Sequence, residues 1–332
     1  MYILGETLDD VLNQSLKSIL ENGTEHETSR GEIIELIGIS LRIKNPLARL
    51  SLSLERSTLF SCIGEFLWYM RGTSALAPIK YYIPKYKDES ADGFTIRGAY
   101  GPRFFDDRGT NQIGQVVKTL QNKPTSRKAI IAILNSGDIA RYRKEIPCTV
   151  SIQFLARDGK LNCIVNMRSN DAYLGLPHDV FAFTMLQECI ARELKLELGV
   201  YHHNVGSFHV YKRNLSNIES YLGEGFQPTT LAMPQMPVTP INIWKSKVLT
   251  IEEKYRKGKL VKISELEKLD EYWVDICCLM KIFAGTKGSA SETQVSAAQD
   301  TVESLNSIIF KEIAQTRIDQ KLGESTQHIM DV

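Results

Sequence analysis

Alternating apolar and polar positions predict a set of β-strands along much of the chain. Five segments rich in β-branched and apolar residues read as strands: residues 32–43, 128–134, 149–156, 161–167 and 198–211. The third and fourth segments are joined by Arg157-Asp158-Gly159-Lys160. Because Asp-Gly between two alternating segments favours a tight turn, this pair predicts a β-hairpin.

Apolar residues at helical spacing predict helices between these strands. Residues 7–20 carry such a pattern, and Thr7 can cap its start. Residues 57–70 are mostly apolar and predict a buried helix with Glu65 inside it, and residues 179–194 are apolar on most faces. Strands grouped around such a central helix indicate an α+β fold.

The character of the sequence changes near residue 246, where Lys and Glu become frequent. Residues 266–284 and 291–315 read as two amphipathic helices separated by a Gly-rich segment. We therefore expect a main domain over residues 1–245 and a helical extension over residues 246–332, packed on or beside that domain.

Composition narrows the class of protein. The 332 residues include 43% hydrophobic and 24% charged residues with a net charge of +1, which argues against a nucleic-acid- or membrane-coating protein. No run approaches the about 18 apolar residues of a membrane span, and the N-terminus has no secretory pattern. The six cysteines form no C-x-x-C pair and no zinc spacing. We expect a reduced cytoplasmic protein that needs no membrane, nucleic acid or metal.

Candidate chemistry gathers around Cys148, which follows a proline at the start of a predicted strand. A cysteine in such a place is by itself more often structural than catalytic. Its context favours catalysis, because polar motifs precede and follow it in the chain: Arg30, Glu65, Ser126-Arg127-Lys128, residues 168–179 (RSNDAYLGLPHD) and His209-Val210-Tyr211.

These motifs, in this order, resemble the thymidylate synthase superfamily. The matching elements are Pro147-Cys148, Arg168-Ser169-Asn170-Asp171, Leu174-Gly175-Leu176-Pro177, His209-Val210-Tyr211, the segment GEFLWYMRGT (64–73) and Ala99-Tyr100-Gly101. The resemblance covers roughly residues 5–245. It implies a mixed β-sheet packed around a central buried helix, with residues 1–245 as the catalytic domain.

The resemblance also implies a reaction. A Cys148 thiolate adds to C6 of a pyrimidine, which makes C5 nucleophilic toward a one-carbon unit from 5,10-methylenetetrahydrofolate. We expect nearby guanidinium groups, above all that of Arg168, to lower the pKa of the thiol. Glu65 is the expected general acid/base; the alternative for a carboxylate in an apolar helix is a buried salt bridge.

Binding roles follow by resemblance, residue by residue. Arg30, Arg168 and Ser169 are expected to hold the nucleotide phosphate, while Arg127 and Lys128 reach it from the second subunit of a homodimer. Lys128 stands where the family usually has a second arginine. His209 and Tyr211 are expected to bind the sugar 3′-hydroxyl, and Asp171 and Gly175 to contact the folate. Tyr100 is expected to belong to the active-site water network. His202 and His203 match no family position, which favours a structural role.

Several departures from the family pattern concern the base. Asp179 stands where thymidylate synthases have the asparagine that reads uracil, and an aspartate suits the amino group and N3 of cytosine better. The same aspartate marks the deoxycytidylate hydroxymethylase branch; its alternative role is a helix N-cap. Thr149 replaces the histidine that follows the cysteine. The loop at 79–99 contains Tyr81, Tyr82, Tyr86 and Phe94 but no tryptophan, which favours capture of the methylene by water.

The sequence thus predicts a cytidylate 5-hydroxymethyltransferase, with ribose and deoxyribose both open. Two alternatives remain: a thymidylate synthase that methylates dUMP, and a non-catalytic nucleotide- or RNA-binding protein on the same fold.

Overall fold

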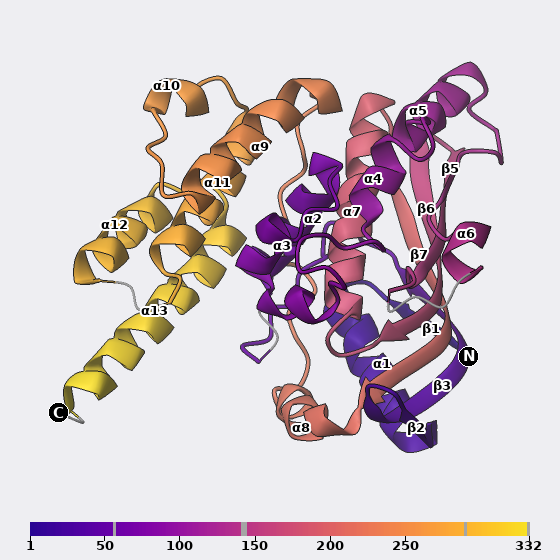
Figure 1. Ribbon diagram of the computed structural model, residues 1–332, viewed down its shortest axis with the longest axis horizontal. Helices are drawn as coiled ribbons and strands as arrows, with labels where there is room; N and C mark the ends of the chain where they lie inside the picture. Colours follow the sequence, from indigo (N-terminus) through magenta and orange to yellow (C-terminus); the bar gives the residue numbers. More distant parts are fainter. Residues whose placement is uncertain (56–57, 141–144, 289–290, 331–332) are drawn as a thin grey trace. The chain divides into compact units, whose positions relative to one another are not determined.

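The computed structural model describes residues 1–55, 58–140, 145–288 and 291–330 (Figure 1). These residues form two compact units, Met1–Ala232 and Met233–Val332. The predicted α+β class is confirmed, while the domain boundary expected after residue 245 stays a prediction. Among the described residues, no helix combines the length and apolarity that crossing a membrane requires.

The first unit is built on a mixed seven-stranded sheet in the order β1-β3-β7-β6-β5-β4, with β2 paired to β3. Strand β1 is parallel to β3 and β6 is parallel to β7, whereas the other neighbours are antiparallel. The strands are β1 (Tyr2–Gly5), β2 (Thr24–Thr28), β3 (Gly31–Ile43), β4 (Ile130–Ala132), β5 (Thr149–Arg157), β6 (Lys160–Asp171) and β7 (Glu197–Tyr211). All five predicted strands are present; the short β1 and β2 escaped prediction.

The predicted hairpin joins β5 and β6. Arg157 pairs with Lys160, and the two turn residues Asp158 and Gly159 both have positive φ, 50° and 74°. Two successive positive φ angles match the right-handed twist of the strands, which explains why Asp-Gly occupies this turn. The hairpin places Cys148, just before β5, beside the end of β6.

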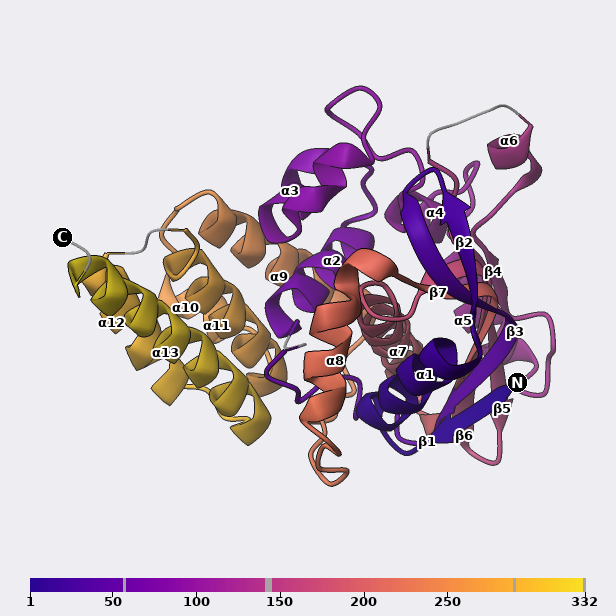
Figure 2. The same cartoon turned by 90° about the horizontal axis from the view of Figure 1, so that it is seen from below.

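Helices of the first unit pack mainly on one side of the sheet (Figure 1, Figure 2). Helix α1 packs against β1 and β3, α7 packs against β6 and β7, and α2 packs against α7. The helices are α1 (Leu8–Asn22), α2 (Leu59–Arg71), α3 (Leu76–Tyr82), α4 (Tyr100–Phe105), α5 (Gln112–Asn122), α6 (Ser136–Ile139), α7 (Leu176–Glu193) and α8 (Leu215–Gly223), with 3₁₀ turns η1 (Pro84–Asp88) and η2 (Lys212–Asn214). Phe181, Phe183 and Leu186 of α7 are at most 1% exposed, which confirms the predicted central helix.

Local sequence explains where two of these helices begin and end. Thr7 accepts a hydrogen bond from the Asp10 N–H while Asp10 accepts one from the Thr7 N–H, the reciprocal cap that starts α1. Helix α2 ends at Gly72, whose φ of 70° is accessible to glycine at little cost. Within α2, a Cβ on Gly64 would lie 2.2 Å from Cγ of Tyr82, so only glycine lets α3 pack this closely.

The second unit is helical, with α9 (Ile241–Arg256), α10 (Ile263–Leu266), α11 (Glu271–Gly285), α12 (Glu292–Glu303) and α13 (Ile308–Met330). Trp244 of α9 stacks on Trp273 of α11 with ring centroids 3.7 Å apart. The expectation of one helix over 291–315 is wrong. Helix α12 ends at Glu303 and α13 begins at Ile308, and between them Asp275 of α11 accepts hydrogen bonds from the backbone N–H groups of Asn306 and Ser307.

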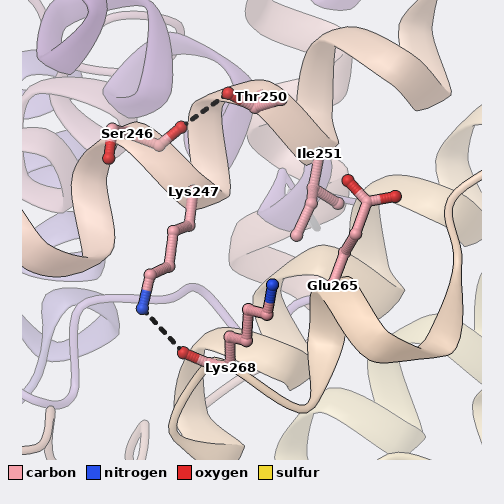
Figure 3. A pocket seen from close by; sticks show the side chains of 6 residues that line it. All are labelled: Ser246, Lys247, Thr250, Ile251, Glu265 and Lys268. Atoms are coloured by element: carbon pink, nitrogen blue, oxygen red, sulfur yellow. Dashed lines mark hydrogen bonds between the residues drawn. The ribbon is translucent and has the colours of Figure 1, made fainter.

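A pocket of about 260 Å³ lies within the second unit (Figure 3). Lys247 Nζ donates to the carbonyl of Lys268 at 2.9 Å, and Thr250 Oγ1 donates to the carbonyl of Ser246 at 2.8 Å. The lining residues are Ser246, Lys247, Thr250, Ile251, Glu265 and Lys268. None of the residues singled out by the sequence lines this pocket.

Candidate active site

Cys148 lies under the side chain of Arg168. The Arg168 backbone N–H donates to the Cys148 carbonyl at 2.8 Å, and its guanidinium donates to the carbonyls of Pro147 and Ile146 at 3.0 and 2.8 Å. Arg168 Nη2 stands 3.5 Å from the Cys148 sulfur. The β5–β6 hairpin therefore places the positively charged Arg168 guanidinium beside the thiol.

The pKa of the Cys148 thiol is nonetheless raised. Burial raises this pKa most, the nearby Arg168 and Arg30 charges lower it, and the Asp179 carboxylate raises it further. The expectation of a lowered thiol pKa is therefore wrong for this structure, because desolvation outweighs the two guanidinium groups.

Glu65 is a buried carboxylate, 5% exposed, and its partners are phenols. Tyr69, one turn further along α2, donates to Glu65 Oε1 at 2.9 Å, and Tyr86 of η1 donates to the same oxygen. Within the described residues, this carboxylate accepts hydrogen bonds from these two phenols and forms no ion pair with a cation. The salt-bridge alternative is thus not what the structure shows, and Tyr69 is a neighbour that the sequence reasoning missed.

Asp179 lies in the first turn of α7 and is half-buried. The N-cap of that helix is Gly175, so the capping alternative for Asp179 is wrong. Asn170 Nδ2 donates to Asp179 Oδ2 at 2.6 Å. Burial, followed by the charge of Glu65, raises the pKa of Asp179 to about 7, against the lowering effect of the Asn170 hydrogen bond.

A buried chain of hydrogen bonds stands behind Asp179. His203 Nε2 is 3.3 Å from Asn170 Oδ1, and His203 Nδ1 is 2.8 Å from the Tyr201 hydroxyl. Burial lowers the pKa of His203 to about 3, so the ring is neutral. With the Asn170 amide donating to Asp179, the neutral ring donates from Nε2 and accepts the Tyr201 hydroxyl at Nδ1. His203 thereby holds Asn170, the hydrogen-bond partner of Asp179, and also packs in the core.

Tyr100 joins the cysteine segment through its hydroxyl, which accepts from Thr149 N and Thr149 Oγ1 at 3.3 and 3.1 Å. Burial raises the pKa of Tyr100, and the charges of Asp179 and Cys148 add to that effect. Thr149, which replaces the family's histidine, is fully buried. The structure therefore brings Tyr100, Cys148 and Asp179 into one electrostatic neighbourhood.

The residues expected at the sugar are adjacent. The rings of His209 and Tyr211 lie 5.3 Å apart at 87°, and Arg213 stacks over the Tyr211 ring at 3.9 Å. His209 is 8% exposed, and its buried Nδ1 has no hydrogen-bond partner among the described residues. A buried ring nitrogen of this kind suits a ligand hydroxyl. Sequence reasoning missed Arg213, for which no motif gave a signal.

The residues expected at the phosphate are only partly together. The charges of Arg30 and Arg168 both lower the pKa of the Cys148 thiol. Ser169 of β6 pairs with Ser207 of β7. Arg127 and Lys128 are exposed just before β4, the last strand in the sheet order. The contacts described for residues 1–55, 58–140, 145–288 and 291–330 do not join these two side chains to Cys148.

Asp171 and Gly175 shape the loop that leads into α7. Asp171 Oδ1 accepts from the backbone N–H groups of Tyr173 and Leu174, both at 2.9 Å, and the Gly175 N–H donates to the Asp171 carbonyl at 3.0 Å. A Cβ on Gly175 would lie 3.1 Å from Asn170 Nδ2, so the close approach of this loop to the Asp179 partner requires a small residue.

Arg168 lies 3.5 Å from the Cys148 sulfur, the Asp179 carboxylate acts on the same thiol, and the Glu65 carboxylate acts on Asp179. This arrangement fits covalent catalysis on a nucleotide. Comparison with known proteins agrees. The sequence model of the family described as "Thymidylate synthase" matches residues 11–264, more than half of the chain. The chain therefore belongs to the thymidylate synthase family, the enzymes that transfer a one-carbon unit from methylenetetrahydrofolate to a pyrimidine nucleotide.

A curated relative supports the same assignment. The chain is similar to a protein named "Thymidylate synthase" from Vesicomyosocius okutanii, with 29% identity over 193 residues that cover 55% of this chain and 71% of the relative.

Proposed function

We propose that this chain is a cytidylate 5-hydroxymethyltransferase that forms 5-hydroxymethyl-CMP or 5-hydroxymethyl-dCMP. The observation that carries this proposal is Asp179, held by Asn170 at 2.6 Å and with a pKa of about 7. Near neutral pH both forms of this acid are available. The protonated form donates to N3 of cytosine and accepts from its amino group, while the ionised form suits a cytosine protonated at N3.

Asn170 also determines which oxygen carries the proton. Because its amide donates to Asp179 Oδ2, that oxygen is an acceptor and the acid proton resides on Oδ1. The hydrogen-bond chain through His203 and Tyr201 supports this orientation. Asp179 then presents one donor and one acceptor in a fixed order, which is how a site distinguishes bases.

The proposed reaction uses this donor first. Transfer of the Asp179 proton to N3 makes C6 electrophilic, and the Cys148 sulfur adds to C6 while its S–H proton passes to solvent. Methylenetetrahydrofolate supplies the one-carbon unit at the oxidation level of formaldehyde. C5 bonds to that unit and its proton passes to solvent. The bond from the unit to the folate nitrogen breaks as tetrahydrofolate leaves, and water adds to the exocyclic carbon. The C6–S bond then breaks as N3 returns its proton to Asp179, which restores the ring and the site, and nothing is oxidised or reduced overall.

Glu65 is the proposed base that takes the proton from water. Tyr69 and Tyr86 both donate to Glu65 Oε1, which stabilises the carboxylate and holds its plane. Tyr86 comes from the loop in which the sequence has no tryptophan. A phenol in this place gives the water-capture step a polar neighbour, which favours hydroxymethylation over methylation.

The other site residues keep their proposed roles. Arg30, Arg168 and Ser169 would bind the phosphate, and His209 with Tyr211 the 3′-hydroxyl, as the unpartnered His209 Nδ1 supports. Tyr100 would order water near Thr149. Asp171 and Gly175 would line the folate side.

We further propose a homodimer in which the partner's Arg127 and the partner's Lys128 complete the phosphate site. Both residues are exposed and lie outside the Cys148 cluster of their own chain. The first unit also exposes large apolar residues on its strands, with Ile37 of β3 79% and Ile130 of β4 47% exposed. Such residues on a sheet face favour burial against a second copy.

The test is tritium release from C5 of labelled CMP, dCMP and dUMP, each with methylenetetrahydrofolate, followed by mass analysis. Release from a cytidylate with a gain of CH2O supports the proposal and identifies the sugar. Release only from dUMP with a gain of CH2 would make the chain a thymidylate synthase. Absence of release from all three would favour a nucleotide-binding protein.

Asp179→Asn tests the base assignment directly. An asparagine amide donates to O4 and accepts from the N3 proton of uracil, so we expect preference to move from cytidylate toward uridylate. The measurement is the ratio of kcat/KM for the two bases. An unchanged ratio would contradict the assignment of Asp179 as the base-reading residue.

A further inference from the structure

Arg30, proposed to bind phosphate, already holds a carboxylate. Its guanidinium forms two parallel hydrogen bonds to Glu89, with Nη1 to Oε1 at 2.8 Å and Nη2 to Oε2 at 2.6 Å. This two-point geometry is the one in which an arginine fork binds phosphate oxygens. The side chain of Arg30 is 55% exposed and that of Glu89 is 29% exposed, so an anion from solvent can reach the pair.

The backbone of Arg30 is held without Glu89. Arg213 Nη1 donates to the Arg30 carbonyl at 2.7 Å, and the Arg30 N–H donates to Thr28 Oγ1 at 3.3 Å. Glu89 therefore engages only the end of the side chain. Loss of this carboxylate leaves the turn between β2 and β3 in place and frees the fork.

Glu89 directly follows η1, the segment that also carries Tyr86. Tyr86 reaches Glu65 while Glu89 reaches Arg30, so one short segment contacts both the proposed base and the proposed phosphate site. The charges of both Arg30 and Glu89 also act on the Cys148 thiol, in opposite directions. The ion pair thus lies at the nucleotide site and not at a remote surface.

We propose that Glu89 is an intramolecular competitor that occupies the Arg30 fork until a phosphate displaces it. A phosphate monoester carries about −1.5 to −2 charges at pH 7 and competes with a single carboxylate charge, whereas a neutral nucleoside does not. Displacing Glu89 therefore costs binding free energy only for ligands that bind the fork, and a neutral nucleoside, which leaves the ion pair in place, incurs none of that cost. The inference rests on the proposed phosphate role of Arg30 and is independent of the base and the product.

The test measures binding to the full chain by calorimetry, with inorganic phosphate, CMP and cytidine as probes. Glu89→Gln removes the charge at nearly constant shape, and Asp88→Asn is the matched control, because Asp88 is its exposed neighbour. We expect Glu89→Gln to tighten binding of phosphate and CMP by on the order of tenfold. Cytidine binding should change little, and Asp88→Asn should leave all three affinities near those of the wild type.

Two outcomes would overturn the proposal. Weaker phosphate binding by Glu89→Gln would mean that Glu89 orients Arg30 for the ligand. An equal gain in Asp88→Asn would mean that only the general charge of the segment matters.

A second background separates this inference from the role of Arg30 itself. In Arg30→Ala, the gain from Glu89→Gln should disappear. If Arg30→Ala binds phosphate as the wild type does, the proposed role of Arg30 fails and the inference fails with it. Because inorganic phosphate has no base, a wrong base or product assignment leaves this result unaffected.

Discussion

Glu65 and Asp179, the two carboxylates of the candidate site, acquire different properties from their immediate partners. Glu65 receives two phenol hydrogen bonds on one oxygen, whereas Asp179 receives one amide hydrogen bond and lies close to the charge of Glu65. Burial then raises the pKa of Asp179 to about 7. Environments that separate the roles of two acids in this way are typical of general acid–base catalysis.

Tyr86→Phe should slow turnover without weakening nucleotide binding. It removes one donor from Glu65 Oε1 but keeps the ring, which packs edge-on against Trp68 at 5.4 Å. We expect kcat to fall about 10-fold to 100-fold with KM for the nucleotide within about 2-fold. Steady-state kinetics are the measurement, with Tyr2→Phe as control because Tyr2 is 55% exposed. An unchanged kcat would show that the phenol contact has no part in turnover.

The raised pKa of Asp179 predicts a pH-dependent stability difference. The folded-state pKa of about 7 exceeds the ordinary 3.8, so ionising this group costs folding free energy, and the cost grows as pH rises from about 4 through 7. Asp179→Asn removes that cost. The variant should therefore gain about 2–4 kcal/mol relative to the wild type between pH 4 and pH 8.

Urea unfolding at intervals of pH measures this difference. Only the change with pH counts, since the substitution also alters the bond to Asn170 by a constant amount. Parallel stability curves for the two proteins would contradict the raised pKa.

At this scale the sequence identified the residues but not their pairings. Cys148, Arg168 and Tyr100 were recognisable from motifs, and they do share one neighbourhood. The pairing of Glu89 with Arg30 joins residues far apart in the chain, and no spacing rule reveals it. The direction of the Cys148 pKa was mispredicted, because it depends on how burial compares with two arginine charges.

At the scale of elements, periodicity predicted the sheet strands and the central helix well. Alternation identified β5, β6 and β7 because one face of each is buried. The second unit was harder, since the segment 291–315 has continuous helical character yet divides into α12 and α13. Between these two helices, Asp275 of α11 accepts hydrogen bonds from the backbone N–H groups of Asn306 and Ser307, and such a tertiary contact leaves no local signal in the sequence.

The contact between α2 and α3 predicts a strong effect of one methyl group. In Gly64→Ala the new Cβ would overlap the Tyr82 ring, so α3 and the η1 segment that follows it must shift. We expect a loss of about 1–3 kcal/mol in unfolding free energy. Activity should fall as well, because η1 carries Tyr86.

Gly223→Ala is the matched control for this prediction. Gly223 ends α8, and a Cβ there meets nothing within 4 Å. Its unfolding free energy should stay within about 0.5 kcal/mol of the wild type. Equal midpoints in denaturant for the two variants would show that Tyr82 can move aside freely.

On the scale of the whole molecule, the proposed dimer predicts complementation between two inactive variants. Cys148→Ser lacks the nucleophile, and Arg127→Ala lacks the arginine proposed to serve the other subunit. When the two are co-expressed, about half of the dimers are mixed and each has one intact site, so about a quarter of wild-type activity should return.

Cys148→Ser with Arg168→Ala is the control pair for this experiment. Arg168 contacts Cys148 of its own chain, so no mixed dimer of this pair has an intact site. Equal recovery in both pairs, or recovery in neither, would contradict the donation of Arg127 across the interface.

The resting state of Cys148 has a consequence for the lifetime of the protein. Peroxide and alkylating agents attack thiolates far faster than thiols. Burial raises the pKa of the Cys148 thiol in spite of two arginines, so the unliganded site should hold less thiolate than an exposed cysteine does. The same desolvation that disfavours the thiolate should therefore slow oxidation of Cys148 between turnovers.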